Sequence, residues 1–365
     1  MNLLLTSAER LRAFYGRQGA QQLLGALGTL IEARARRGAA SRLVLIEAGA
    51  PDLGVPRALV TPDAIARQLG ALEAALAVRG QPLASVLLVG GPEIVPFHEA
   101  ENPTEYDGDA HVPGDCFYGP QNPYASASDW AVARMPGAFG SDPQLLLQLL
   151  ANAAELGPLT PLAKTFGYTT AVWRQNARIV YGEVDRPERL LISPPRVAAT
   201  LNRRRLDGAR LVYCNLHGIA AGPPWYGQAP EHPALVVALR PSDLEGLDLR
   251  GAVVISEACY GAAIEGRDPA SSLALAFLAQ GAACFVGATA ISYGPAGPPP
   301  GEADLIALHF LRAIKQPGTT LGQAFVAARA GMLHDTLRSQ SALDEDDQKT
   351  LLEFVLYGDP TLVVS

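Results

Sequence analysis

The apolar positions of the chain fall into short runs of aliphatic residues that alternate with longer amphipathic stretches. Residues 43–46 and 85–89 are nearly continuous apolar runs, typical of strands that are covered on both faces. Between them the pattern predicts a helix over residues 62–78, with Thr61 as N-cap residue and Pro62 at the first helical position. This alternation favours an α/β fold, with helices on both faces of a mostly parallel sheet.

The same alternation recurs in the second half of the chain, after a predicted helix over residues 142–156. The predicted strands of this half lie at 165–172, 211–215, 252–256 and 283–287. Its predicted helices lie at 194–204, 271–280, 302–313 and 320–334. We therefore expect two β/α subdomains, residues 1–157 and 158–365, joined near residue 157.

Residues 99–138 interrupt the pattern. They are rich in proline, glycine, asparagine, aspartate and aromatic residues and show little periodicity. Such composition predicts a long ordered loop region, close to a functional site or to the edge of a domain.

Composition and charge narrow the class of protein. Hydrophobic residues make up 48% of the chain and charged residues only 18%, which argues against disorder. The net charge is −7 and the basic residues are scattered, so nucleic acid is not expected as a partner. No apolar run is long enough to cross a bilayer, and residues 1–6 lack the features of a secretory signal; they are expected to form a first strand.

The four cysteines are too few and too widely spaced to suggest a disulfide scaffold. They are Cys116, Cys214, Cys259 and Cys284. We therefore expect a cytoplasmic protein with free thiols and no membrane partner.

Two predicted strands end in residues that can carry chemistry. His217 and Gly218 follow the strand at 211–215, and Cys259 follows the strand at 252–256. Ligands bind beyond the carboxyl ends of parallel strands, and neighbouring strands lie about 5 Å apart, so His217 and Cys259 could face a common cleft. A thiolate is a nucleophile and an imidazole can move a proton to a leaving amine. The backbone N–H groups of Gly218 and Cys259 could hold a developing oxyanion.

Several motifs together resemble the clan of cysteine peptidases that contains caspases, legumains, separases and gingipains. His-Gly after one strand and Ala-Cys after the next is the signature of this clan, and further segments are similar to the gingipain branch in particular. These segments are Val86-Leu87-Leu88-Val89-Gly90-Gly91 with Ile94-Val95-Pro96, Ser128-Asp129-Trp130-Ala131-Val132-Ala133-Arg134-Met135-Pro136, Gly287-Ala288-Thr289 with Tyr293-Gly294, Leu321-Gly322-Gln323-Ala324-Phe325 with Ala328-Arg329, and Tyr357-Gly358-Asp359-Pro360. They cover nearly the whole chain, in order.

The resemblance implies a caspase-like, doubly wound, mostly parallel sheet in two subdomains, of which only residues 158–365 carry the catalytic pair His217 and Cys259. It implies a cysteine endopeptidase that acts on a polypeptide substrate through an acyl-enzyme thioester, and it leaves room for a regulatory protein partner. Gingipains also place a carboxylate behind the histidine. Residues 167–173, the comparable stretch, contain no acid, so either a backbone carbonyl orients His217 or the site is a dyad.

Glu257 stands two positions before Cys259 and therefore shares a strand face with it. In legumains and metacaspases the residue at this place lines the first specificity pocket, so the resemblance implies cleavage after a basic residue. An ordinary ion pair between Glu257 and an arginine is the alternative. Trp225 and Tyr293 are the other residues expected to contact the substrate, although Trp225 could equally be an ordinary half-buried aromatic residue.

The motifs require no metal and no other cofactor. Cys214 and His217 have the spacing of half a zinc site, but a second pair of ligands is missing. Gingipains bind calcium, which leaves open a hard-cation site in the 99–138 region; a solvated polar loop is the alternative. The acidic residues in question are Asp107, Asp109, Asp115 and Asp129.

Two other functions compete with the peptidase. A catalytically idle caspase-like module could serve as a scaffold or binding subunit. A doubly wound enzyme for small molecules is disfavoured because no glycine-rich phosphate loop follows any predicted strand.

Overall fold

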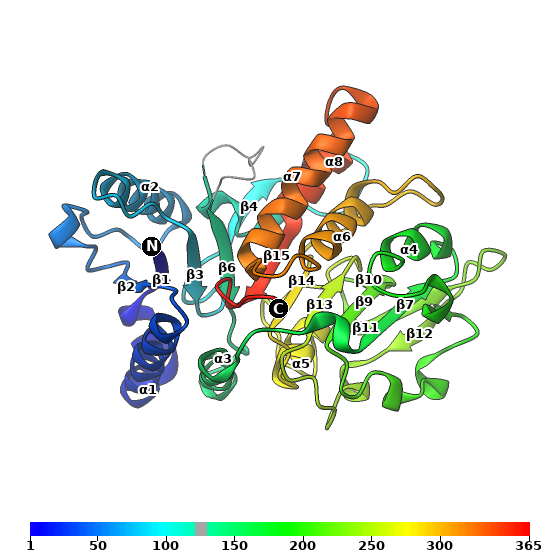
Figure 1. Ribbon diagram of the computed structural model, residues 1–365, viewed down its shortest axis with the longest axis horizontal. Coiled ribbons are helices and arrows are strands. Elements are labelled where there is room, and N and C mark those ends of the chain that lie inside the picture. Colours follow the sequence, from blue (N-terminus) through cyan, green and yellow to red (C-terminus); the bar gives the residue numbers. More distant parts are fainter. Residues whose placement is uncertain (121–129) are drawn as a thin grey trace.

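A central sheet with helices on both faces organises the computed structural model, which describes residues 1–120 and 130–365 (Figure 1). Within these residues the sheet has ten strands, in the order β2-β1-β3-β6-β15-β14-β13-β9-β7-β8. All neighbouring pairs are parallel except β14 with β15. The strands are β1 (Asn2–Thr6), β2 (Ser41–Leu45), β3 (Ser85–Val89), β6 (Ala131–Met135), β7 (Thr165–Thr170), β8 (Leu191–Ser193), β9 (Leu211–Asn215), β13 (Val253–Ser256), β14 (Cys284–Ala288) and β15 (Phe354–Gly358). The sequence prediction of a caspase-like, mostly parallel α/β sheet is confirmed.

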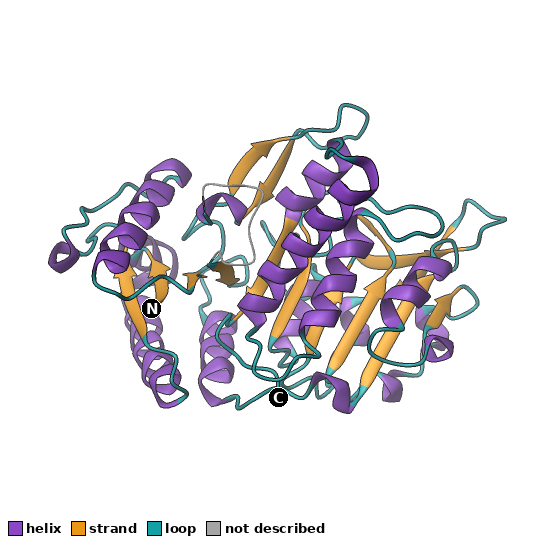
Figure 2. Ribbon diagram, turned by 45° about the horizontal axis from the view of Figure 1, so that its top comes forward, coloured by secondary structure: helices purple, strands orange, loops and turns teal. Residues whose placement is uncertain are grey.

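Two smaller sheets lie beside the large one (Figure 2). The first is a three-stranded antiparallel sheet of β10 (His217–Ile219), β11 (Gly222–Gln228) and β12 (Leu235–Leu239). The second is a hairpin of β4 (His98–Glu101) and β5 (His111–Gly114). The three-stranded sheet begins at His217, so it fixes the backbone of the candidate catalytic histidine.

Helices cover both faces of the large sheet because its strands are apolar on both sides; every residue of β3, β9 and β14 is buried. The helices are α1 (Ala8–Arg36), α2 (Pro62–Val78), α3 (Gln144–Glu155), α4 (Arg174–Tyr181), α5 (Leu273–Ala279), α6 (Glu302–Ala313), α7 (Leu321–Gln340) and α8 (Glu345–Glu353). In Figure 1, α1, α3 and α5 lie along the lower side of the sheet, and α2, α7, α6 and α4 lie along the upper side.

Local sequence signals explain several helix starts. The Ser7 hydroxyl accepts a hydrogen bond from the Arg10 N–H at 3.1 Å and caps α1. Thr320 and Gln323 form a reciprocal capping box at the start of α7. The helix predicted at 62–78 has the bounds of α2 and begins at Pro62, but the Thr61 side chain makes no capping hydrogen bond.

The two halves of the chain contribute to one sheet. The ladder between β6 and β15 contains a single residue pair, Arg134 with Tyr357. β15 is parallel to β6 but antiparallel to β14. The strand direction therefore reverses between β15 and β14. The division into subdomains at 1–157 and 158–365 stays a prediction.

Some expected elements differ from the structure. The helix predicted at 194–204 is absent; two short 3-10 turns replace it, and most of its side chains are at least partly exposed, so it lacks an apolar face that could pack against the sheet. The region 99–138 is not only loop, because it contains β5 and β6. The sequence patterns did not predict α1 and α4.

Candidate active site

The two strands that lead to His217 and Cys259 are neighbours in the sheet. β9 and β13 pair in parallel, with Leu211 opposite Val253 and Cys214 opposite Ser256. The chain leaves the carboxyl end of β9 towards His217 and the carboxyl end of β13 towards Cys259. The prediction of adjacent parallel strands that end at these two residues is therefore confirmed.

The backbones of the two strand ends touch at Gly218. A Cβ atom placed on Gly218 would lie 1.8 Å from the carbonyl oxygen and 2.9 Å from the carbonyl carbon of Cys259. Only glycine can therefore stand next to His217 in this arrangement. The absence of a side chain at Gly218 makes room for the backbone of Cys259.

The Cys259 side chain is half-buried and lies against the loop after β14. Its Sγ is 3.4 Å from both the N–H nitrogen and the carbonyl oxygen of Ser292. Burial raises the pKa of the Cys259 thiol, and the backbone N–H groups of Ser292, Cys259 itself and Gly218 act in the opposite direction. The N–H groups of Gly218 and Cys259, which the sequence indicated as oxyanion donors, thus both favour the thiolate form of Cys259.

The His217 ring packs on Trp173, with 4.3 Å between the ring centroids. Burial lowers the pKa of His217, and the nearby Gln228 side chain partly offsets this effect. Nε2 of His217 is buried and has no hydrogen-bond partner among the described residues. The histidine is thus held as a neutral imidazole with a ring nitrogen available for a proton. The direct contact between the His217 and Cys259 side chains stays a prediction.

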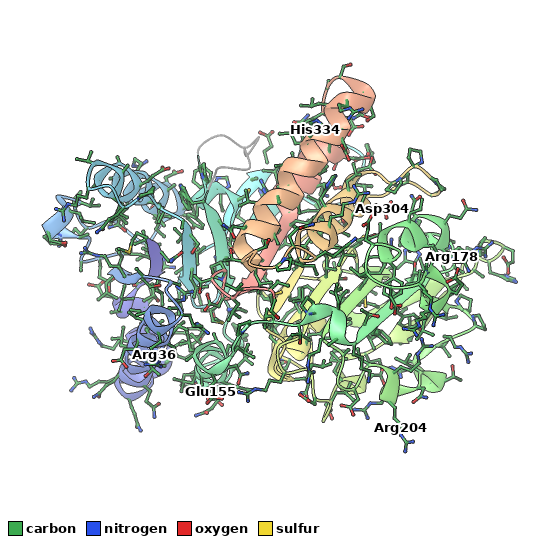
Figure 3. All side chains as sticks on the ribbon, in the orientation of Figure 1. Arg36, Glu155, Arg178, Arg204, Asp304 and His334 are labelled. Atoms are coloured by element: carbon green, nitrogen blue, oxygen red, sulfur yellow. The ribbon has the colours of Figure 1, made fainter. Side chains whose placement is uncertain are left out.

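Glu257 points into a buried polar cluster and not towards an arginine. Its side chain accepts a hydrogen bond from Asn215 Nδ2, and it interacts with the Asp304 carboxyl group. Burial raises the pKa of Glu257 well above its ordinary value, and the nearby charge of Asp304 raises it further. Burial also raises the pKa of Asp304, which lies on α6 (Figure 3). The two carboxyl groups therefore retain a proton that isolated carboxyl groups would lose.

Amide groups from two elements complete this cluster. Asn176 Nδ2 on α4 donates to Asp304 Oδ2 at 2.9 Å, and Asn215 Nδ2 lies 3.4 Å from Asp304 Oδ1. Glu257 Oε1 is buried with no hydrogen-bond partner in the described part of the chain, and so is the hydroxyl of Tyr213, which lies near enough to lower the pKa of Glu257. A buried acceptor without a partner is costly, which marks Glu257 Oε1 as an atom that a ligand could satisfy.

A small pocket opens beside this cluster, with a volume of about 20 Å³, room for roughly one water molecule. It is lined by Trp173, Asn215, Glu257, Ser292, Tyr293, Gly294, Pro295, Ala303 and Asp304. Tyr293 lines this pocket, and its contact with substrate stays a prediction. Trp225 is not, because it is buried among the core residues Phe277 and Phe285, 6.2 and 6.3 Å away between ring centroids; that expectation was wrong.

Sequence reasoning missed three residues of the site: Trp173, Asn176 and Asp304. Trp173 belongs to residues 167–173, the stretch that contains no acid. Asp304 is far from Glu257 in the sequence and reaches it only because α6 packs beside α4. No sequence signal that we recognise marks it.

The acidic residues considered for a hard cation are paired with cations of the protein itself. The Lys349 ammonium binds Asp107 and Asp109, and the Arg134 guanidinium binds Asp115. Asp129 lies outside the described residues. Among residues 1–120 and 130–365, no group of three or more histidine, cysteine, aspartate or glutamate side chains could hold a metal ion.

Comparisons with known proteins agree with this picture of the fold. Residues 234–365, a segment that contains Glu257, Cys259 and Tyr293 and begins after His217, match the family model described as Peptidase family C25. The structure is similar to that of the complex of Porphyromonas gingivalis RgpB pro- and mature domains, at a TM-score of 0.67 and 12% identity over 100% of this chain and 79% of that chain. It is also similar to the Arg-specific cysteine proteinase gingipain R, at a TM-score of 0.66 and 13% identity over 100% and 78% of the two chains.

No curated protein matches the sequence. In the described part of the chain, every helix is too short or too polar to span a membrane. The four cysteines are free thiols. At identities of 12–13% the structural comparisons establish the fold, and the family match adds the segment around Cys259. The chain thus has the caspase-like fold of the gingipains, and its residues 234–365 match their cysteine peptidase family.

Proposed function

We propose that the chain is a cysteine endopeptidase in which Cys259 is the nucleophile and His217 is the general base and acid. The observation that carries this proposal is the meeting of the two strand ends. Gly218 lies against the Cys259 backbone. The N–H groups of both residues lower the pKa of the Cys259 thiol, against the larger effect of burial. A carbonyl carbon bound next to the sulfur would bring its oxygen near these donors.

The proposed reaction has two halves. His217 takes the proton of the Cys259 thiol, and the sulfur attacks the peptide carbonyl carbon to give a tetrahedral oxyanion near the N–H groups of Gly218 and Cys259. The oxyanion collapses, the C–N bond breaks, and the imidazolium gives its proton to the leaving amine. Water, deprotonated by His217, then attacks the thioester, releases the acid product and restores the thiol.

The residue that orients His217 is not an acid in this proposal. The stretch 167–173 offers none, and the histidine instead interacts with the Gln228 side chain on β11. A carbonyl oxygen of an amide can fix the tautomer of the imidazole as a backbone carbonyl would. The site therefore acts as a dyad that Gln228 orients.

Glu257 and Asp304 support specificity for a basic residue before the scissile bond. An arginine or lysine side chain would supply the hydrogen-bond partner that Glu257 Oε1 lacks and would allow the shared proton to leave. The pocket holds about one water molecule in this structure. Entry of a long side chain therefore requires Trp173 and Tyr293 on its walls to move.

A panel of fluorogenic peptides that differ only before the scissile bond tests both parts of the proposal. We expect turnover after arginine and lysine, with asparagine as the nearest competitor, and loss of the basic preference in Glu257→Gln and Asp304→Asn. Electrophilic peptide probes should label the wild-type protein and not Cys259→Ala. Labelling or turnover that survives Cys259→Ala, or a preference for leucine or aspartate, would contradict the proposal.

An idle scaffold is the second candidate function, and one observation favours it. Burial holds both members of the pair in their neutral forms, by raising the pKa of Cys259 and lowering that of His217. Many thiol peptidases instead keep a thiolate beside an imidazolium. Absence of probe labelling at any pH between 5 and 9, in a folded protein, would select this alternative.

A further inference from the structure

A buried lysine lies behind the candidate active site and joins three segments that are distant in the sequence. Lys349 on α8 has a side chain with no exposed surface, and its Nζ contacts the carboxylates of Asp107 and Asp109 on the loop between β4 and β5. These carboxylates in turn bind tyrosines of the two loops that surround Cys259. We call the group of Lys349, Asp107, Asp109, Tyr260 and Tyr293 the lysine brace.

Asp109 holds the chain on both sides of the nucleophile. Its Oδ1 accepts a hydrogen bond at 2.6 Å from the hydroxyl of Tyr260, the residue directly after Cys259. Its Oδ2 accepts one at 2.8 Å from the N–H of Ile291, the residue directly before Ser292, which contacts the Cys259 sulfur. One carboxylate thus fixes the turn that carries the thiol and the loop that the thiol touches.

Asp107 holds the wall of the pocket. Its Oδ2 accepts a hydrogen bond at 2.8 Å from the hydroxyl of Tyr293, which lines the pocket beside Glu257. Asp107 also fixes its own loop, because Asn102 Nδ2 and the Asp109 N–H donate to its Oδ1 at 2.7 and 3.0 Å.

The charge balance around Lys349 shows why the lysine is needed. A third carboxyl group, that of Glu353 on α8, is also fully buried; burial raises its pKa, and the Lys349 charge acts in the opposite direction. The Asp107 and Asp109 side chains are 4% and 10% exposed. Two carboxylates this close repel each other and disfavour burial unless a cation stands between them. The Lys349 ammonium is the cation that contacts both, and it also lies 5.6 Å from the centroid of the Tyr293 ring. Without it, the hydrogen bonds to Tyr260, Ile291 and Tyr293 would depend on an uncompensated pair of negative charges.

We propose that Lys349 is a positioning residue of the active site, which acts on Cys259 and on the pocket only through Asp109 and Asp107. This inference rests on the proposed role of Cys259. It gives the 99–138 region a function, since the loop between β4 and β5 supplies both carboxylates. It also assigns the two tyrosines separate effects, because Tyr260 adjoins the nucleophile and Tyr293 adjoins the specificity pocket.

Lys349→Met and the milder Tyr260→Phe and Tyr293→Phe test the proposal in the full-length protein. Three quantities are measured in each: kcat and KM for an arginine peptide, and the rate at which iodoacetamide alkylates Cys259, followed by mass spectrometry. The matched control is Arg34→Met, which breaks another fully buried ion pair. Its partner Asp359 follows the end of β15, beside the start of β14 and so away from the carboxyl ends of β9 and β13.

A displacement of the nucleophile by about 1 Å can reduce turnover about 100-fold, so we expect kcat to fall by about 10- to 100-fold in Lys349→Met. Tyr260→Phe loses one hydrogen bond to a carboxylate, so its kcat should fall about tenfold with KM retained. Tyr293→Phe should mainly raise KM. Alkylation of Cys259 should slow about tenfold in Lys349→Met, because the thiol loses the ordered N–H of Ser292. Arg34→Met should lower the unfolding midpoint and leave all these rates unchanged.

The proposal is overturned if the folded Lys349→Met and Tyr260→Phe proteins behave as Arg34→Met does. If Lys349→Met does not fold, the kcat and the alkylation rate of Tyr260→Phe decide alone. Alkylation needs no turnover, so the result separates a failure of the brace from a failure of the peptidase proposal.

Discussion

Replacement of Gly218 by alanine tests the meeting of the two strand ends with a single methyl group. The backbone at Gly218 is not in the left-handed region, so alanine introduces no strain in φ, and its effect must be steric. The new Cβ would lie 1.8 Å from the Cys259 carbonyl oxygen, whereas real Cβ contacts are not shorter than 3.0 Å. Backbone on one side or the other must therefore move by more than about 1 Å.

A shift of this size acts on stability and on turnover to different degrees. Overpacking by one methyl group costs about 1–3 kcal/mol of unfolding free energy. A displacement of about 1 Å at the reacting atoms costs about 100-fold in rate. We therefore expect Gly218→Ala to remain folded, with kcat/KM reduced about 100-fold and Cys259 alkylated at an altered rate.

The matched control is Gly222→Ala in the same antiparallel sheet. A Cβ on Gly222 would lie 3.4 Å from Ile219 Cδ1 and 3.5 Å from Pro224 Cδ, which are ordinary contacts. Urea unfolding and kcat/KM for an arginine peptide are measured for both variants. Wild-type kcat/KM in Gly218→Ala, or an equal loss in both variants, would show that the close approach of Gly218 to Cys259 is not needed for activity.

Three further predictions concern buried side chains. Cys259→Ala should abolish turnover, whereas Cys284→Ala should retain it and lose about 0.5–3 kcal/mol of stability, as urea unfolding and peptide assays will show. Burial raises the pKa of Asp304 to about 6, so the folded protein binds more protons than the unfolded chain between about pH 4 and pH 6, and stability falls as the pH rises through this window. Relative to wild type, Asp304→Asn should therefore gain roughly 2–3 kcal/mol as the pH rises from 4 to 7, and parallel stability–pH curves would contradict the assigned pKa. Arg134→Met leaves the buried Asp115 carboxylate without its guanidinium partner, bound at 2.9 and 2.5 Å. This change should cost about 3–5 kcal/mol of unfolding free energy, measured by urea unfolding. A smaller loss than in a variant that breaks an exposed ion pair would refute this prediction.

The sequence predicted the elements whose apolar runs were unbroken. β3, β9 and α6 have the predicted bounds, because continuous burial on both faces leaves little ambiguity about where a strand lies. α1 was not predicted, and it is not one continuous helix, because Gly16, with a φ of 71°, interrupts it. The helix expected at 194–204 failed because a helical pattern without a face to bury is not stable by itself.

The candidate site was predictable where it depends on sequence neighbours and not where it depends on packing. His217, Gly218 and Cys259 each follow a strand directly, so the strands themselves identified them. Asp304 and Lys349 come from helices whose docking the sequence does not reveal. The sequence analysis assigned no element to residues 345–353, which form α8; Asp344 caps this helix, which brings Lys349 into the interior.

The position of β15 has a consequence for the synthesis of the protein. This strand comes after all the others in the chain, yet it is inserted in the middle of the sheet, between β6 and β14. While the chain emerges from the ribosome, β6 and β14 are complete long before residues 354–358, so each presents an unpaired apolar edge to its surroundings. Such edges readily pair with other chains. A nascent chain that lacks β15 therefore leaves the edges of β6 and β14 open to such pairing until residues 354–358 are added.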